Sequence, residues 1–203
     1  MHRLGVDPKG IDVVFVSHLH ADHSFGLPFL LLEYCVRYER DEPLYVVGPG
    51  RLEESVMKAC ELAWPDMQAA GIHPRVPLRF VEVTEEGEYR AGDLPFTAIP
   101  MRHYDLDALG FRFDYREKTF AYTGDTGPCD QVTRLIAGAD AAIVELTHPR
   151  TSDDPGHLDV EEVIRFTAEL RQRGALVLAT HMSATPPPVA GLTICEDGGT
   201  YYV

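Results

Sequence analysis

The sequence lacks the features that mark membrane, secreted and metal-thiolate proteins. No apolar run reaches the length of about 20 residues that a bilayer span requires. The first residues, MHRLGVDPKGID, resemble neither a signal peptide nor a transit peptide. The four cysteines are scattered and contain no Cys-x-x-Cys pair, which argues against a disulfide framework or a zinc-thiolate site. We therefore expect a cytoplasmic protein with reduced cysteines and no membrane partner.

Positive charge is also scarce. The chain has 18 Lys and Arg residues against 32 Asp and Glu residues, a formal net charge of −14 with neutral histidines. Proteins that bind a nucleic-acid backbone usually present a basic stripe, and the sequence has no cluster of Lys or Arg that would supply one. The expected partner is a small-molecule substrate, with nucleotide-like chemistry as one option, rather than extended nucleic acid.

The length and pattern of the chain indicate one layered α/β domain over residues 1–203. Asp159 and Glu162 have the spacing of a capping box at the start of the last predicted helix. Strands that alternate with helices are typical of layered α/β domains. Strands are expected at residues 12–17, 44–47, 78–83, 96–100, 110–114, 120–123, 141–146 and 175–180, and helices at 25–38, 52–63 and 160–173.

A dense group of metal-binding side chains follows the first predicted strand. Residues 17–24 read SHLHADHS, so three histidines and one aspartate lie close together in the chain. Imidazole nitrogens and carboxylate oxygens are the ligands that zinc and related divalent ions prefer. In a turn leaving a strand, His18 and His20 can point the same way, and Asp22 and His23 can turn toward a second point. The motif therefore predicts ligands for two ions, which in hydrolytic sites lie roughly 3.5–4 Å apart.

Three further candidate ligands come directly after other predicted strands. FTAIPMRH ends in His103, TFAYTGD ends in Asp125, and ALVLATH ends in His181. The carboxyl ends of strands are where α/β sheets usually build their sites. Taken singly, Asp125 could be a turn residue and each histidine an ordinary loop residue. The same placement after four strands favours a common role as metal ligands.

These motifs resemble the signature of the metallo-β-lactamase superfamily. HLHADH followed by SFGLPFLL, the later TGDT, and ATHMS match its successive motifs. PLYVVGPG, RHYDLDALGFRF and PGHLDVEEVIRFTAEL are most similar to the ribonuclease Z-like phosphodiesterases of that superfamily. The resemblance spans nearly the whole chain. It implies an αβ/βα four-layer sandwich of two mixed β-sheets with outer helices.

The resemblance also implies a ligand set for two divalent ions, with Zn²⁺ favoured and Mn²⁺ or iron also suited to these ligands. The implied assignment gives one ion to His18, His20 and His103, the other to Asp22, His23 and His181, and Asp125 to both as a bridge.

The expected catalytic residues are Asp22 and His157. In the ribonuclease Z-like branch a histidine before the last helix assists catalysis, and His157 has that position here, although it could also be a loop histidine beside Gly156. His148 is a weaker candidate for the same role. Glu145 could orient a ligand histidine through a hydrogen bond.

The sequence departs from the family pattern in two places. Its first metal motif comes earlier in the chain than in typical members, so we expect a shortened first sheet, whose bared surface would favour a homodimer. The stretch between His103 and Asp125 is too short for the RNA-binding arm of the tRNA-processing enzymes. This departure argues against tRNA 3′-end processing by the familiar route.

The function expected from these features is metal-dependent hydrolysis. A hydroxide that bridges two metal ions would attack a phosphodiester, because bound metal lowers the pKa of water to about 7. The second reading is hydrolysis of a lactone, thioester or β-lactam. The third is a non-catalytic, metal-binding member of the superfamily, since a fold by itself does not establish activity.

Overall fold

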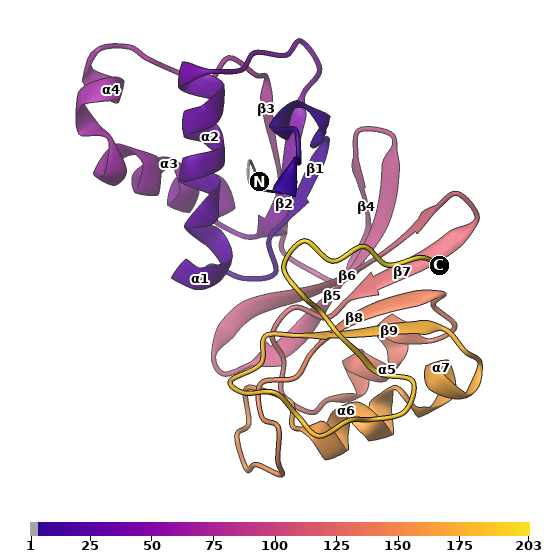
Figure 1. The fold of residues 1–203 in the computed structure, drawn as a ribbon. Coiled ribbons are helices and arrows are strands. Elements are labelled where there is room, and N and C mark those ends of the chain that lie inside the picture. Colours follow the sequence, from indigo (N-terminus) through magenta and orange to yellow (C-terminus); the bar gives the residue numbers. More distant parts are fainter. Residues whose placement is uncertain (1–3) are drawn as a thin grey trace. The chain divides into compact units, whose positions relative to one another are not determined.

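The computed structural model describes residues 4–203, and they divide into two compact units. The first unit ends at Thr84, and the second runs from Glu85 to Val203. Each unit has its own sheet (Figure 1). Each also has its own cluster of buried apolar side chains. The single domain over residues 1–203 stays a prediction, and the two units are described in turn.

The first unit is built on a three-stranded sheet with the order β1-β2-β3. All three described strands of this sheet are parallel. The reason is that helices connect its strands, and a helical crossover returns the chain in the same direction. Its strands are β1 (Val13–Phe15), β2 (Leu44–Pro49) and β3 (Leu78–Val83), with a 3-10 turn η2 (Pro8–Gly10) before β1.

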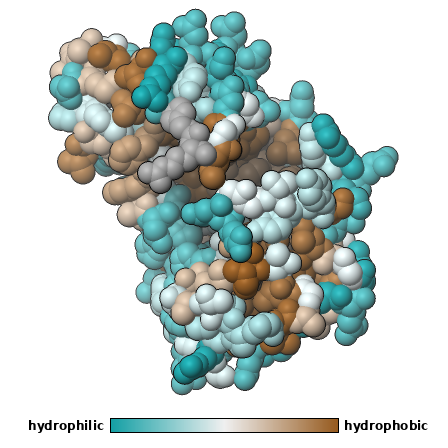
Figure 2. Space-filling view, viewed as in Figure 1, coloured by the Kyte–Doolittle hydropathy of each residue, from teal (hydrophilic) through white to brown (hydrophobic). Residues whose placement is uncertain are grey.

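The helices of the first unit pack on this sheet through apolar side chains. Leu31 and Tyr34 of one helix, and Leu52 and Val56 of another, are buried against β2. A cavity of about 90 Å³ remains among the helices. Figure 2 shows apolar groups gathered on the surface of this unit, at the upper left. The helices are α1 (Ala21–Ser24), α2 (Gly26–Val36), α3 (Leu52–Ala63) and α4 (Pro65–Ala69).

The second unit has a seven-stranded sheet with the order β10-β9-β8-β7-β6-β5-β4. The sheet is mixed, as expected: β4 to β7 form an antiparallel meander, and β7 to β10 are parallel. The edge strand β4 was not predicted, because its sequence GEYRA is mostly polar. The strands are β4 (Gly87–Ala91), β5 (Leu94–His103), β6 (Leu106–Tyr115), β7 (Lys118–Tyr122), β8 (Ala141–Glu145), β9 (Leu176–Thr180) and β10 (Thr193–Ile194).

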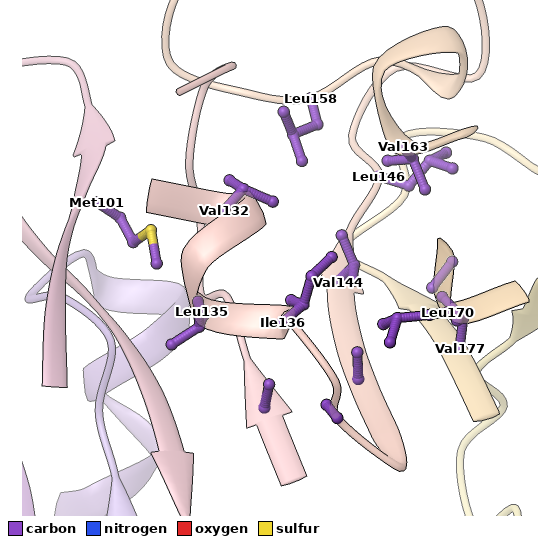
Figure 3. Packing of buried hydrophobic residues seen from close by; sticks show 14 of the residues in the cluster. Met101, Val132, Leu135, Ile136, Val144, Leu146, Leu158, Val163, Leu170 and Val177 are labelled. Carbon is purple, nitrogen blue, oxygen red and sulfur yellow. The ribbon is translucent and has the colours of Figure 1, made fainter. Parts of the chain in front are cut away.

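Three helices, α5 (Asp130–Ile136), α6 (Val160–Phe166) and α7 (Ala168–Gln172), line one face of the large sheet (Figure 1). Figure 3 shows Leu135 and Ile136 of α5 and Leu170 of α7 packed over the sheet residues Val144 and Val177. This core holds the layer together through apolar burial.

The last predicted helix, residues 160–173, is interrupted at Thr167. The Thr167 hydroxyl donates to the Val163 carbonyl at 2.7 Å, and hydroxyls that bond back in this way often bend a helix. The predicted capping box is present, with the Asp159 carboxylate accepting from the Glu162 amide at 2.9 Å and the Glu162 carboxylate accepting from the Asp159 amide.

Strand direction brings the candidate ligands of the second unit together. Because β5, β7, β8 and β9 all run the same way, their carboxyl ends meet at one edge of the sheet. His103 ends β5, and Asp125 and His181 follow β7 and β9. The chain between His103 and Asp125 is taken up by β6, β7 and short connections, with no protruding arm in this described stretch. Within residues 4–203, no helix is long and apolar enough to cross a membrane.

Candidate metal centre

The first unit presents its four candidate ligands on the turn after β1 and on the short helix α1. His18 lies between the strand and the helix and is buried, whereas Asp22, on α1, is exposed. The ring centroids of His20 and His23 lie 4.6 and 4.2 Å from that of His18. The three imidazoles of the motif therefore lie close together within this unit, and their assignment to two ions stays a prediction.

Ser17 is a shared partner of two of these imidazoles. Its hydroxyl lies 3.1 Å from Nδ1 of His18 and 3.5 Å from Nδ1 of His23. Nε2 of His23 is 3.4 Å from the Asp22 carboxylate. Contacts at Nδ1 fix the ring orientation and make Nε2 the candidate ligand atom. Ser17 was not singled out from the sequence, although its place directly before His18 was the available signal.

In the second unit, His103 is fixed by a backbone acceptor. Nδ1 of His103 is 2.8 Å from the Gly156 carbonyl oxygen, and His103 is fully buried. A carbonyl oxygen can only accept, so Nδ1 carries the proton, and the lone pair of the neutral ring is on Nε2. This is the tautomer that a metal ligand requires, with the second nitrogen held by a hydrogen bond.

His181 is held in the same way by a threonine. The Thr147 hydroxyl donates its hydrogen to Glu145 at 2.8 Å, so it accepts from Nδ1 of His181, also at 2.8 Å. Nε2 of His181 then lies 3.3 Å from a carboxylate oxygen of Asp125. His181 has a positive φ of 57°, an uncommon backbone conformation that tends to mark functional positions.

Glu145 lies at the centre of this hydrogen-bond network. It is almost fully buried at the end of β8, and its carboxylate accepts five hydrogen bonds. Charge-assisted bonds of this kind compensate for burying a carboxylate. The donors are the amides of Thr126, Thr147 and Leu158, the Thr147 hydroxyl and Nδ1 of His157, at 2.8–3.1 Å.

His157 lies within this network, and His148 lies outside it. The hydrogen bond that His157 donates to the Glu145 carboxylate raises the pKa of His157 above its usual value, although burial acts in the opposite direction. The His157 ring stacks on that of His181 at 5.3 Å between centroids. His148 instead bonds to Asp154 at 3.0 Å. Glu145 thus contacts His157 directly and is linked to the candidate ligand His181 through Thr147.

The donor set of the second unit fits a divalent cation. One ligand atom from each of His103, Asp125 and His157 lies within 4.8 Å of the others, and Glu145, His157 and His181 form a second such group. The imidazole lone pair of His181 and the Asp125 carboxylate face each other, an arrangement that a shared cation stabilises. The residues present therefore suit the hard-to-borderline metals expected from the sequence.

The sequence did not reveal Thr147, Tyr104 or Asp154 as members of this region. Thr147 carries a single hydroxyl that serves Glu145 and His181, and only the fold shows that they are adjacent. Its position just after β8, at the edge that carries the other ligands, was a usable signal. Tyr104 and Asp154 lie in loops, where periodicity carries no information.

The chain is similar to known proteins in sequence and in fold. Residues 2–182 match the model of the beta-lactamase superfamily domain. A ribonuclease Z from Ignicoccus hospitalis is 28% identical over 223 residues, covering 86% of this chain and 71% of that protein. The crystal structure of the human short-form tRNase Z superposes with a TM-score of 0.74 at 19% identity, over 98% of this chain and 81% of that one.

A second solved structure, the metallo-beta-lactamase fold protein YhfI from Bacillus subtilis, gives a TM-score of 0.64 at 18% identity, over 95% of this chain and 77% of that one. The chain has the metallo-β-lactamase fold. It belongs to the metallo-β-lactamase superfamily, because the superfamily model matches residues 2–182.

Proposed function

We propose that this protein is a metal-dependent hydrolase of phosphodiesters. The observation that carries the proposal is the set of oriented histidines in the second unit, where His103, His157 and His181 each have Nδ1 bonded to a fixed acceptor. Metal binding and proton transfer both require histidine rings that are held in one orientation. A purely structural loop would not need its histidine rings ordered in this way.

The proposed ligands are those expected from the sequence. His18, His20, Asp22 and His23 serve from the first unit, and His103, Asp125 and His181 from the second. The proposed cofactor is a pair of divalent ions, with Zn²⁺ favoured by the five imidazoles. Bound metal would supply Lewis acidity and an activated water at neutral pH.

His157 acts through its Nε2 atom. Because Nδ1 is held by Glu145, the ring is oriented and Nε2 faces away from that carboxylate. From there it can hold a proton for the leaving oxygen or bind a phosphate oxygen. Asp22 is proposed as the second catalytic group, because its carboxylate lies beside His23 and is exposed.

The substrate class follows from the relatives and from charge. The similar proteins named ribonuclease Z support a phosphodiester as the scissile group. The net charge of −14 favours a small, nucleotide-like diester over an extended RNA. We accordingly propose a cyclic or short linear diester as substrate, with RNA as the comparison to be measured.

The test is hydrolysis of bis(4-nitrophenyl) phosphate by the protein loaded with Zn²⁺ or Mn²⁺. We expect turnover that is lost on chelation and restored by metal. His157→Gln should lower kcat about 10²- to 10⁴-fold, the usual effect of removing a general acid or base. The control His73→Gln changes an exposed histidine of the first unit and should leave turnover unchanged.

The opposite results are equally informative. Metal-loaded protein that hydrolyses lactones, thioesters or β-lactams but no diester would overturn the substrate class. Bound metal without turnover of any of these would indicate a non-catalytic member.

A further inference from the structure

Tyr104 occupies a backbone position that favours glycine. It is the first of the two turn residues between β5 and β6, since His103 pairs with Leu106 in the sheet register. Its φ is +49°. Two-residue hairpins with a positive φ at the first turn residue usually have glycine there, because a Cβ atom is strained in that conformation. A tyrosine in this strained conformation points to a role for its side chain.

The Tyr104 side chain is held against the loop that carries Gly156 and His157. Its hydroxyl donates to Asp154, with distances of 3.0 and 3.2 Å to the two carboxylate oxygens. Its ring lies directly on Gly156, where an added Cβ would come within 2.5 Å of a ring carbon. The ring centroid is also 4.9 Å from that of His103 and 5.7 Å from that of His157.

Asp154 belongs to this loop and connects Tyr104 to other residues of it. Its carboxylate accepts from the Gly156 amide at 2.9 Å and from Nε2 of His148 at 3.0 Å. His148 anchors the far end, since its amide donates to the Leu158 carbonyl and its carbonyl accepts from the Val160 amide. The loop is thus tied at both ends and at its centre.

The loop contacts the candidate site through two residues. The Gly156 carbonyl accepts a hydrogen bond from Nδ1 of His103. The next residue, His157, donates a hydrogen bond to Glu145. A shift of Gly156 would therefore move the acceptor that sets the His103 tautomer and the backbone of His157 together. Tyr104, Asp154 and His148 do not make these two hydrogen bonds themselves.

We infer that Tyr104, Asp154 and His148 form a clamp that positions Gly156 and His157 for the reaction. The inference rests on the proposed function for its kinetic effect, but the clamp itself is a property of the loop. The three are positioning residues, because each acts through the loop. Groups that orient ligand histidines typically contribute 10- to 100-fold to metal affinity or activity.

Two substitutions of Tyr104 separate the clamp from general stability. Tyr104→Phe keeps the ring and removes the bond to Asp154. Tyr104→Gly removes the side chain and relieves the backbone, so the fold should be retained. In both we expect kcat on bis(4-nitrophenyl) phosphate to fall about 10-fold or more while KM changes little. Tyr115→Phe, which removes an exposed hydroxyl elsewhere on the same sheet, should have wild-type kcat.

Rescue by a conservative change provides a second test. His148→Gln places an amide donor near the position of Nε2 and should retain more activity than His148→Leu, which has no donor. In a double-mutant cycle, Tyr104→Phe combined with Asp154→Asn should cost no more than the larger single loss, because both break the same link. Additive losses, or equal losses in the two His148 variants, would overturn the clamp.

A readout that does not need turnover separates this inference from the proposed function. In protein with ¹⁵N-labelled histidine, the Nδ1 proton of His103 should exchange slowly with solvent in the wild type. It should exchange faster in Tyr104→Phe, because Asp154, which holds the Gly156 amide, loses its hydrogen bond from the tyrosine hydroxyl. Unchanged exchange would overturn the clamp even in an active enzyme. Faster exchange in a protein without diesterase activity would support the clamp and reject the proposed function.

Discussion

His103 and Gly156, 53 residues apart in the chain, share a hydrogen bond of 2.8 Å from the imidazole Nδ1 to the backbone carbonyl. The bond joins the end of β5 to the loop before α6. It fixes which nitrogen of His103 carries the lone pair, so one backbone atom sets the chemistry of a candidate ligand. The same loop places His157 beside Glu145, and the arrangement leads to the following predictions.

Replacing Glu145 with glutamine should damage the site and the fold together. The amide nitrogen of glutamine cannot accept, so some of the five donors that now contact the carboxylate would lose their partner. Each unsatisfied buried group costs about 1–3 kcal/mol of unfolding free energy. Urea denaturation of Glu145→Gln should show a loss in this range, whereas Glu161→Gln on the exposed side of α6 should show almost none. Equal stability of the two variants would contradict the role of Glu145.

Gly127 is packed where no side chain fits. A Cβ atom there would lie 1.9 Å from the Pro155 carbonyl oxygen, so Gly127→Ala must displace the loop that carries His157. Overpacking of this kind typically costs about 1–3 kcal/mol, and we also expect kcat to fall. Gly26→Ala is the matched control, because nothing lies within 4 Å of its added Cβ. Thermal unfolding and diesterase assays of both variants measure the difference, and a fully active Gly127→Ala protein would be inconsistent with this packing.

Asp154 should make stability depend on pH in the acid range. Partial burial raises its pKa, but hydrogen bonds from Gly156, His148 and Tyr104 outweigh that effect and hold the pKa at about 2. A lowered pKa in the folded state means that the contribution is complete above the ordinary value near 4 and is lost as pH falls toward 2. The destabilisation caused by Asp154→Asn should therefore shrink between pH 5 and pH 2.5 in denaturant titrations. A pH-independent difference would show that the carboxylate is not held in this way.

The sequence predicted the α/β class and most strands because their signals are local. Residues 78–83 and 52–63 were placed to the residue, since apolar periodicity there is strong and turn residues bound both segments. The Asp159 capping box was also found from spacing alone. Strand β4 and helix α5 were missed, because short polar segments gain their structure from pairing with β5 and packing on the sheet.

The candidate ligands were predictable for a similar reason, since each follows a strand in the chain. Their partners were not. Thr147 bonds to His181 from 34 residues away, and Tyr104 bonds to Asp154 from 50 residues away. Such contacts depend on the positions of β5, β8 and β9 in the sheet, and no spacing in the sequence encodes that order. The hydrogen-bond partners that lie in the loops therefore could not be predicted from the sequence.

The central claim, that these side chains hold two divalent ions, is tested most directly by metal stoichiometry. The protein would be dialysed against Zn²⁺, and the bound metal counted by native mass spectrometry in the wild type, in Asp125→Ala and in the surface control Asp130→Ala. The account predicts two ions in the wild type and in Asp130→Ala, and fewer in Asp125→Ala, because Asp125 is the proposed bridge. A wild type without bound metal, or an Asp125→Ala protein that still holds two ions, would contradict it.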